Sequence, residues 1–316
     1  MGRFIVRRFI AMVFVLFAVS VLVFLIFNVI PNGDPAARMA GKNSTPATIE
    51  AIREDWGFDD PLYQQYITTM GKIFTGDLIS YANREDVVDR ILDGAPRTFA
   101  LAIGAAILWF VAGVALGLFS AVRAGKVSDR LVTVLALIGI SMPVFWLGAL
   151  MNYYLGYKLG IFPNGGYVTI SEGGIFDWGY HLILPWIALS VLFIGVYSRV
   201  LRSSVLDTMH DDYVRTARAK GISEKRVMRH HVLRNSMIPV ITLWGLDFGA
   251  VLGGGAILTE TVFDIQGVGQ YFQESISRLD VPPVMAVTMF GAFFIVLFNA
   301  IVDIVYAALD PRIRLS

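Results

Sequence analysis

Apolar residues along the chain are gathered into six long stretches, and the charged residues lie almost entirely between them. A helix needs about 20 consecutive apolar residues to cross the roughly 30 Å hydrocarbon core of a bilayer. Each stretch meets or approaches that length, so the pattern predicts an all-α integral membrane protein with six transmembrane helices. These spans are predicted at residues 9–30, 98–122, 131–157, 182–198, 240–259 and 284–302.

The composition agrees with this fold class. The 316 residues are 56% hydrophobic and 16% charged, with a mean hydropathy of +0.63, which is too apolar for an ordinary soluble domain. A net charge of +1 gives no reason to expect a nucleic acid partner. The chain has no cysteine, which excludes a disulfide, a thiolate metal site and a cysteine nucleophile. The first span follows Arg7 and Arg8 without a small-residue cleavage site, so we expect it to remain as a membrane helix.

The distribution of lysine and arginine predicts the orientation, because these residues are retained on the cytoplasmic face. Residues 1–8, 123–130, 199–238 and 303–316 carry 3, 3, 9 and 2 of them, whereas the short loops 158–181 and 260–283 carry one each. The long segment 31–97 is exempt from this rule because of its length. We therefore expect both termini to face the cytoplasm.

The 40 residues from Arg199 to Ile238 form a basic polar segment between two apolar spans. Asp211 and Asp212 are suited to capping the start of a helix, Gly221 to ending it in the left-handed conformation, and Ser223 to capping a second helix. One interpretation is that the positive charges only fix the topology and contact anionic lipid. The alternative is that the bent helix pair transmits force from a soluble partner to the adjoining spans.

Segment 31–97 has the pattern of short helices at the outer membrane surface. Thr45-Pro46 and Asp60-Pro61 each place a capping side chain before a proline, which predicts two helix starts, and Gly76 is suited to ending the second helix. This second helix carries an apolar stripe that either docks a partner or only braces the bundle. The stripe consists of Leu62, Tyr63, Tyr66, Ile67, Met70, Ile73 and Phe74.

Within the spans, Asp247 is the one acidic residue near the middle of an apolar stretch. A carboxylate there costs about 2.5 to 3.5 kcal/mol on insertion scales, so it should face the bundle interior or water. It is our candidate for lining a pathway, and a structural hydrogen bond to a neighbouring helix is the alternative. In the same span, Gly249 and the run Gly253 to Gly255 permit close packing or a local break. Pro143, after Ser141 and Met142, predicts a kink in the third span.

Catalytic and metal-binding interpretations find little support. Ser141 lacks the Gly-x-Ser-Gly setting of an intramembrane serine protease. His181, its conceivable partner, is expected at the opposite end of the membrane from Ser141. His230 and His231 are adjacent, so on a helix they point about 100° apart and cannot share a metal ion without other ligands. We predict neither a catalytic residue nor a metal site. A scaffold protein bound to lipid is a third class of function that the sequence leaves open.

The segment around Gly221 resembles the EAA loop of permease subunits in binding-protein-dependent ABC importers, in the form of the dipeptide, oligopeptide and nickel group. The small-residue triplet of that motif falls on Arg215-Thr216-Ala217, so its glutamate and one alanine are absent here. The spacing from Gly221 to Pro239 is five residues longer than in the general pattern, which is a feature of the peptide-importer group. Further matches in the same order span nearly the whole chain and resemble the first permease subunit of that group. They are Arg3 to Arg8, Pro31 with Gly33-Asp34-Pro35, Gly76-Asp77-Leu78, Ser141 to Trp146, Glu260 to Phe263 with Gly267-Val268-Gly269, and Leu309 to Arg314.

The resemblance implies a type I ABC importer permease fold and a set of partners. Such subunits pair with a second, similar permease, bind two cytoplasmic ATPase subunits and receive substrate from an extracytoplasmic binding protein. The chain has no Gly-x-x-x-x-Gly-Lys-Ser/Thr motif, so ATP and Mg²⁺ would be bound by the partner subunits and not by this chain. The outer-gate residues implied are Glu260, Phe263 and Gly267. The coupling helix implied for the ATPase comprises Tyr213, Val214, Arg215, Thr216, Ala217, Arg218, Ala219, Lys220 and Gly221.

This gives three expected regions: residues 1–30 with the first span, an extracytoplasmic segment 31–97, and a core permease domain 98–316 containing the coupling loop 199–238. Short peptides are the expected cargo. Nickel complexes, glutathione and oligosaccharides are alternatives carried by similar subunits, because selection depends largely on the binding protein.

Overall fold

The structure is a computed structural model that describes residues 2–30, 34–41 and 44–309, with side chains from residue 5 to residue 305 in these ranges. Pro31, Gly33 and the end of the chain after Leu309, which contribute to the resemblance noted above, lie outside the described residues. The chain forms two compact units, residues 1–100 with 249–300 and residues 101–248 with 301–316. Regular structure in the described part is helical, apart from one isolated bridge between Ile79 and Asp86.

Five helical segments in the described ranges are long and apolar enough to cross a membrane, and a bent pair brings the number to six if it forms one broken span. The pair joins residues 127–141 to residues 144–158 at an angle of 98°. Five of the six predicted spans are therefore found as continuous helices, and the third predicted span corresponds to the bent pair. The five continuous segments are Ile5–Val29, Val87–Val122, Ile170–Thr208, Glu224–Gly255 and Val281–Val305.

The break in the third span lies where Pro143 predicted a kink. Helix α6 (Val127–Ser141) ends before Met142, which is extended at φ −88° and ψ 126°, and α7 (Val144–Met151) follows Pro143 and continues into η2 (Asn152–Lys158). A proline disfavours the helical conformation of the residue before it and offers no amide hydrogen to the ladder. The result is a sharp turn between two helices instead of a gentle bend.

Two helices are much longer than their apolar cores. The expected spans 98–122 and 182–198 become α5 (Val87–Val122) and α8 (Ile170–Thr208). Backbone hydrogen bonding continues through polar residues as readily as through apolar ones, so hydropathy marks only the part of a helix that suits the membrane. Helix α8 is interrupted early at Gly174, where φ is +72°.

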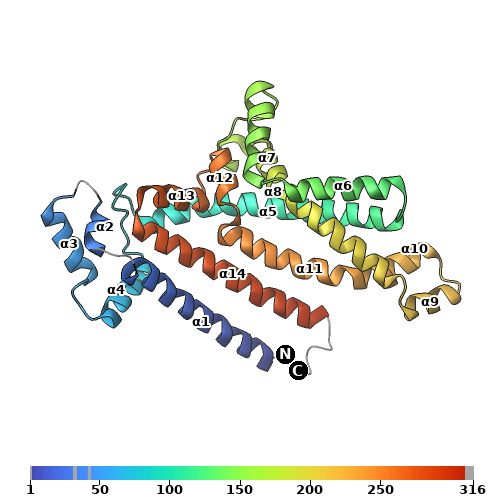
Figure 1. Ribbon diagram of the computed structural model, residues 1–316, viewed down its shortest axis with the longest axis horizontal. Coiled ribbons are helices and arrows are strands. Elements are labelled where there is room, and N and C mark those ends of the chain that lie inside the picture. The colour runs from blue at the N-terminus through green and yellow to red at the C-terminus, as the bar shows by residue number, and fades with distance from the viewer. Residues whose placement is uncertain (1, 31–33, 42–43, 310–316) are drawn as a thin grey trace. The chain divides into compact units, whose positions relative to one another are not determined.

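In the first unit, α1 (Gly2–Phe24) and η1 (Leu25–Val29) are followed by α2 (Pro35–Ala40), α3 (Pro46–Trp56) and α4 (Leu62–Thr75) (Figure 1). Thr45 caps α3 as predicted, since its hydroxyl oxygen accepts the Thr48 amide at 3.2 Å, and Gly76 ends α4 at φ +83°. Asp60 is not the cap of α4. The N-cap position is Pro61, whose carbonyl accepts the amides of the first turn.

The predicted apolar stripe of α4 divides between two environments. Tyr66 contacts Phe17 and Phe24 of α1 edge-on, at 6.3 and 5.5 Å between ring centroids, and its hydroxyl lies 2.7 Å from the Ser20 hydroxyl. Met70, one turn further along, is buried. Helix α4 therefore braces α1. The other side of the stripe is exposed and comprises Leu62, Tyr63, Ile67 and Phe74.

The chain returns to the first unit through η4 (Val251–Gly255), α12 (Ile257–Phe263), α13 (Val268–Arg278) and the first part of α14 (Val281–Leu309). Close packing is seen at Gly253, since a Cβ added at Gly291 would lie 2.6 Å from the Gly253 carbonyl oxygen. A local break is seen at Gly254, where φ is +138°. Both roles considered for these glycines therefore occur, at adjacent residues.

In the second unit, α8 packs against α6 and α7. It also approaches α5 closely, because a Cβ added at Gly117 would lie 2.8 Å from the Ser198 carbonyl oxygen and 3.0 Å from the Leu201 Cβ. Trp109 of α5 is fully buried and stacks on Phe193 at 4.4 Å between centroids. Helix α8 is followed by α9 (Asp212–Ala219), α10 (Glu224–Arg226), η3 (Val227–Val232) and α11 (Leu233–Ala250).

Candidate functional site

The basic segment forms the expected helix, glycine break and second helix. Helix α9 ends just before Gly221, which has φ +74°, and α10 then continues through η3 into α11 (Figure 1). Asp211 and Ser223 occupy the two N-cap positions, but neither side chain makes the predicted capping hydrogen bond. The amides that would need them are already bonded, since Val214 N donates to the Asp211 carbonyl at 3.0 Å and Arg226 N to the Ser223 carbonyl at 2.9 Å.

Helix α9 has one face held against its own unit and one face left open. Val214 and Ala217 are buried, and α9 packs against η3. Tyr213 ties the two segments together, because its hydroxyl accepts from Asn235 Nδ2 at 2.7 Å and donates to the His231 carbonyl at 3.3 Å. Of the nine predicted coupling residues, only those on the outer face are available to a partner. The exposed ones are Tyr213, Arg215, Thr216, Ala219, Lys220 and Gly221.

Arg218 bridges the bend. Its Nε donates to Glu224 Oε1 at 2.9 Å, across the glycine break, and its guanidinium also donates to the Met209 carbonyl at 3.3 Å. The side chain therefore joins the end of α8, helix α9 and the start of α10. These contacts connect the bend to the helices that enter and leave it.

An ion pair that the sequence did not predict joins α8 near this segment to a buried carboxylate of α6. Arg202 donates twice to Asp129 of α6, from Nε at 2.7 Å and from NH2 at 2.8 Å. The Asp129 carboxylate also accepts from the Ser120 hydroxyl at 2.5 Å and from the Gly125 amide at 2.8 Å. Asp129 is only 3% exposed, and bidentate pairs of this kind are among the strongest hydrogen bonds in proteins. An acid within the basic turn 123–130 was the one available signal.

Asp247 lies on α11, and its carboxylate accepts a hydrogen bond from a neighbouring helix. The Tyr197 hydroxyl of α8 donates to Asp247 Oδ2 at 2.8 Å, and Tyr197 is fully buried whereas Asp247 is partly exposed. One turn away, the Trp244 indole donates to the Ala106 carbonyl of α5 at 3.1 Å. The carboxylate thus has a structural partner and also an accessible side.

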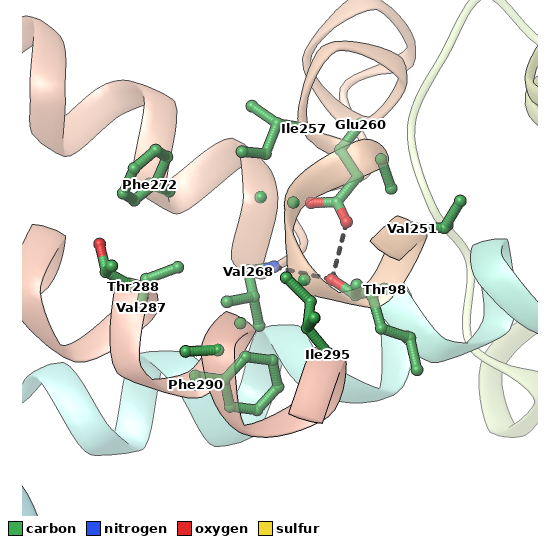
Figure 2. A pocket seen from close by; sticks show the side chains of 17 residues that line it. Thr98, Val251, Ile257, Glu260, Val268, Phe272, Val287, Thr288, Phe290 and Ile295 are labelled. Carbon is green, nitrogen blue, oxygen red and sulfur yellow. Dashed lines mark hydrogen bonds between the residues drawn. The ribbon is translucent and has the colours of Figure 1, made fainter. Parts of the chain in front are cut away.

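Of the residues expected at an outer gate, Glu260 lines a small cavity of about 210 Å³ in the first unit, whereas Phe263 and Gly267 do not. Figure 2 shows the Glu260 carboxylate directed at Thr98, whose hydroxyl donates to Glu260 Oε1 at 2.8 Å and accepts from the Val268 amide at 2.9 Å. Glu260 Oε2 accepts from the Gln270 amide at 2.9 Å. The remaining walls are mainly apolar residues of η4, α12, α13 and α14.

The side chain of Glu260 therefore caps the N-terminus of α13. Full burial raises the pKa of Glu260 to about 7, although its hydrogen bonds with Thr98 and with the amides of Gln270 and Gly269 oppose the rise. Gly267 is required here, since an added Cβ would overlap the Glu260 carboxylate and would lie 2.6 Å from Thr98 Oγ1. Glu260 and Gly267 thus form one site. Phe263 is buried at the end of α12.

Comparison with known proteins places the chain in a family of transport proteins. Residues 113–315 match the family described as binding-protein-dependent transport system inner membrane component, and residues 1–102 match the corresponding N-terminal family. The chain belongs to this family and is a membrane component of a binding-protein-dependent transport system.

Three curated relatives match the chain over its whole length. The probable peptide ABC transporter permease protein y4tP of Sinorhizobium fredii is 35% identical, over 99% of this chain and 100% of that protein. The oligopeptide transport system permease protein AppB of Bacillus subtilis is 36% identical over the same shares. The glutathione transport system permease protein GsiC of Escherichia coli is 38% identical, over 99% of each.

One solved structure, titled as inward facing conformations of the MetNI methionine ABC transporter, supports the fold. It aligns with a TM-score of 0.58 at 17% identity and covers 72% of this chain and 99% of the matched chain. At this level of identity the match concerns the fold and not the cargo. The importer-permease fold predicted from the sequence is therefore confirmed.

Proposed function

We propose that this chain is one of two permease subunits of an ATP-driven importer and that its cargo is a short peptide. The support is the naming of full-length relatives as peptide and oligopeptide permeases at 35% and 36% identity. A second permease would complete the pathway, two cytoplasmic ATPase subunits would bind ATP and Mg²⁺, and an extracytoplasmic binding protein would deliver the cargo. In this arrangement both termini face the cytoplasm and segment 31–97 lies outside.

The proposed coupling element is the exposed face of α9. It is presented by a bend that Arg218 and Tyr213 brace internally, and Val214 and Ala217 attach it to η3. A partner that moves this face would therefore move α8 and α11 with it. Asp247 is the proposed pathway residue, because its carboxylate is partly exposed beside the buried Tyr197.

Co-purification of the ATPase subunits tests the coupling proposal. Thr216→Glu and Ala219→Glu place a negative charge on the exposed face of α9 without changing its buried side, and we expect each to release the ATPase from detergent-solubilised complexes. Ser223→Glu adds the same charge beyond Gly221 and should retain it. Ala217 is unsuitable for this purpose because it is buried. Retention of the ATPase by both α9 variants would show that this helix is not the contact.

The cargo is tested by uptake. Proteoliposomes containing the complete transporter, with the binding protein outside and ATP in the lumen beside the ATPase subunits, should accumulate radiolabelled di- and tripeptides. Glutathione is the second candidate, because a full-length relative at 38% identity is named as a glutathione permease. Uptake of glutathione without uptake of unmodified peptides would replace the first proposal by the second.

A further inference from the structure

A second cavity, of about 380 Å³, lies within segment 31–97 and shares no residue with the coupling helix, with Asp247 or with the cavity beside Glu260. Its size falls within the range of ligand pockets, which begins at about 300 Å³. Helix α3 forms one wall, Lys72 of α4 a second and the turn before α5 a third. The polar and aromatic residues that line it are Thr48, Asp55, Trp56, Lys72, Asp77, Tyr81 and Arg84.

The charges in this cavity are of both signs. Lys72 Nζ lies 2.8 Å from Asp55 Oδ1 and 3.9 Å from Asp77 Oδ2, and its side chain is only 13% exposed. The same ammonium group lies 5.6 Å from the centre of the Trp56 ring, within the range of a cation–π contact. The two carboxylates are open, with 55% and 76% of their side chains exposed. They therefore retain oxygen lone pairs for a further cationic group.

The cavity also offers hydrogen-bond donors. The Trp56 indole donates to the Tyr81 hydroxyl oxygen at 2.7 Å, so the hydroxyl proton of Tyr81 points to another acceptor. Burial is the main cause that raises the pKa of Tyr81, which keeps this proton in place. Arg84 supplies a guanidinium that is exposed at the cavity. A carboxylate would find both donors in this cavity.

The turn that carries Tyr81 and Arg84 is held rigidly. The buried Asp280 carboxylate accepts from the Ser80 hydroxyl at 2.5 Å and from the amides of Tyr81 and Ala82 at 3.3 Å each. Arg84 is kept at φ +60°, a conformation that an arginine seldom adopts and that persists only when its surroundings enforce it. The backbone that carries both donors is thus fixed in place before any ligand arrives.

We propose that this cavity binds a small zwitterion, a free amino acid or a short peptide, with its ammonium group on the exposed oxygens of Asp55 and Asp77, which Lys72 leaves open, and its carboxylate facing Arg84 and the Tyr81 hydroxyl. The four charged side chains of the walls sum to zero, which matches a ligand of zero net charge that carries both signs. A singly charged ion would leave one side uncompensated. The site is separate from Asp247 and does not depend on which cargo crosses the membrane.

Isothermal titration of the full transporter in nanodiscs tests the proposal, with alanyl-alanine as the probe and with neither ATP nor binding protein present. The lipids should lack ethanolamine headgroups, which carry the same two charges. We expect saturable binding that is lost when the probe is replaced by N-acetyl-alanyl-alanine amide, which has neither charge. If adding lipid with ethanolamine headgroups abolishes peptide binding, the natural ligand of this site is a headgroup.

Three variants assign the binding to this cavity. Asp77→Asn and Arg84→Asn should each weaken binding at least about tenfold, and asparagine is chosen at position 84 because it tolerates the left-handed conformation. Glu54→Gln, on α3 next to Asp55 but outside the cavity, should leave binding unchanged. Matching thermal melts would show that the variants are folded.

Two results would overturn the proposal: no binding by the wild-type transporter, or undiminished binding by both Asp77→Asn and Arg84→Asn. Asp247→Asn separates this site from the proposed function. If it alone removes the binding of the peptide, the probe occupies the translocation pathway and this cavity is not a site. Failure of peptide uptake in proteoliposomes with retained cavity binding would reject the cargo and leave the cavity assignment standing.

Discussion

Removal of one member of the ion pair between the buried Asp129 and Arg202, whose side chain is 30% exposed, should destabilise the second unit. Arg202→Gln leaves a carboxylate that is only 3% exposed without its cation, and Asp129→Asn leaves the guanidinium without its two charge-assisted bonds of 2.7 and 2.8 Å. Breaking a buried pair from one side typically costs about 3 to 5 kcal/mol. The Ser120 and Gly125 donors still stabilise the carboxylate and Arg202 is partly exposed, so we expect a loss of at most about 3 kcal/mol for Arg202→Gln.

The assay is unfolding of the purified chain in mixed micelles by increasing the fraction of a denaturing detergent, followed by tryptophan fluorescence. The double variant should lose clearly less than the sum of the two single losses, because the second change removes a charge that is already unpaired. Asp212→Asn breaks a matched exposed pair, with Arg215 at 3.5 Å and side chains 97% and 74% exposed, and should leave the midpoint unchanged. Single variants that unfold at the wild-type midpoint would refute the reasoning.

Three further changes have defined expected outcomes. Burial raises the pKa of Glu260 to about 7 from 4.5. Between these two pH values the folded state holds a proton that the unfolded chain releases. The free energy of unfolding should therefore be highest below about pH 4.5 and fall by about 3 kcal/mol as the pH rises to about 7. The free energy of unfolding of Glu260→Gln, measured by denaturation at a series of pH values, should not fall over this range. A wild-type free energy that is equally independent of pH would contradict the prediction. Gly117→Ala should lower the melting temperature, because its Cβ would lie 2.8 Å from the Ser198 carbonyl oxygen and overpacking costs about 1 to 3 kcal/mol; an unchanged melting temperature would mean that the two helices separate at no cost. Asp247→Asn should reduce uptake of peptides with a free amino terminus more than uptake of acetylated ones, whereas Tyr197→Phe, which keeps the carboxylate, should not discriminate; equal effects of the two variants would make Asp247 purely structural.

The helix–glycine–helix bend was predictable because its signals are local. Gly221 adopts the left-handed conformation that its lack of a side chain permits, and Asp211 and Ser223 occupy the first positions of the two helices. Their side-chain hydrogen bonds were predicted wrongly, because the amides concerned are bonded to backbone carbonyls instead. Residue type thus located the helix ends, whereas the backbone geometry at those ends decided the bonds.

The predicted outer-gate residues illustrate a similar division. The sequence suggested Glu260, Phe263 and Gly267 only through a resemblance, and nothing in their spacing indicates that Glu260 closes the N-terminus of α13 through the amide of Gln270 and a bond to Thr98. Thr98 lies 162 residues away from Glu260 along the chain. Periodicity and capping rules reach only a few residues, so they cannot pair such distant positions.

The sequence by itself determined the number of apolar spans, the break at Pro143 and the bent basic segment, because hydropathy, proline chemistry and glycine conformation act within one turn or one span. The family membership confirmed by comparison was also recognisable from ordered motifs along the chain. Only the tertiary structure decided that Asp129 pairs with Arg202, that Tyr197 bonds Asp247 and that Lys72 lies between Asp55 and Asp77. These pairings depend on which helix faces pack together, and that is set by the burial of many side chains at once.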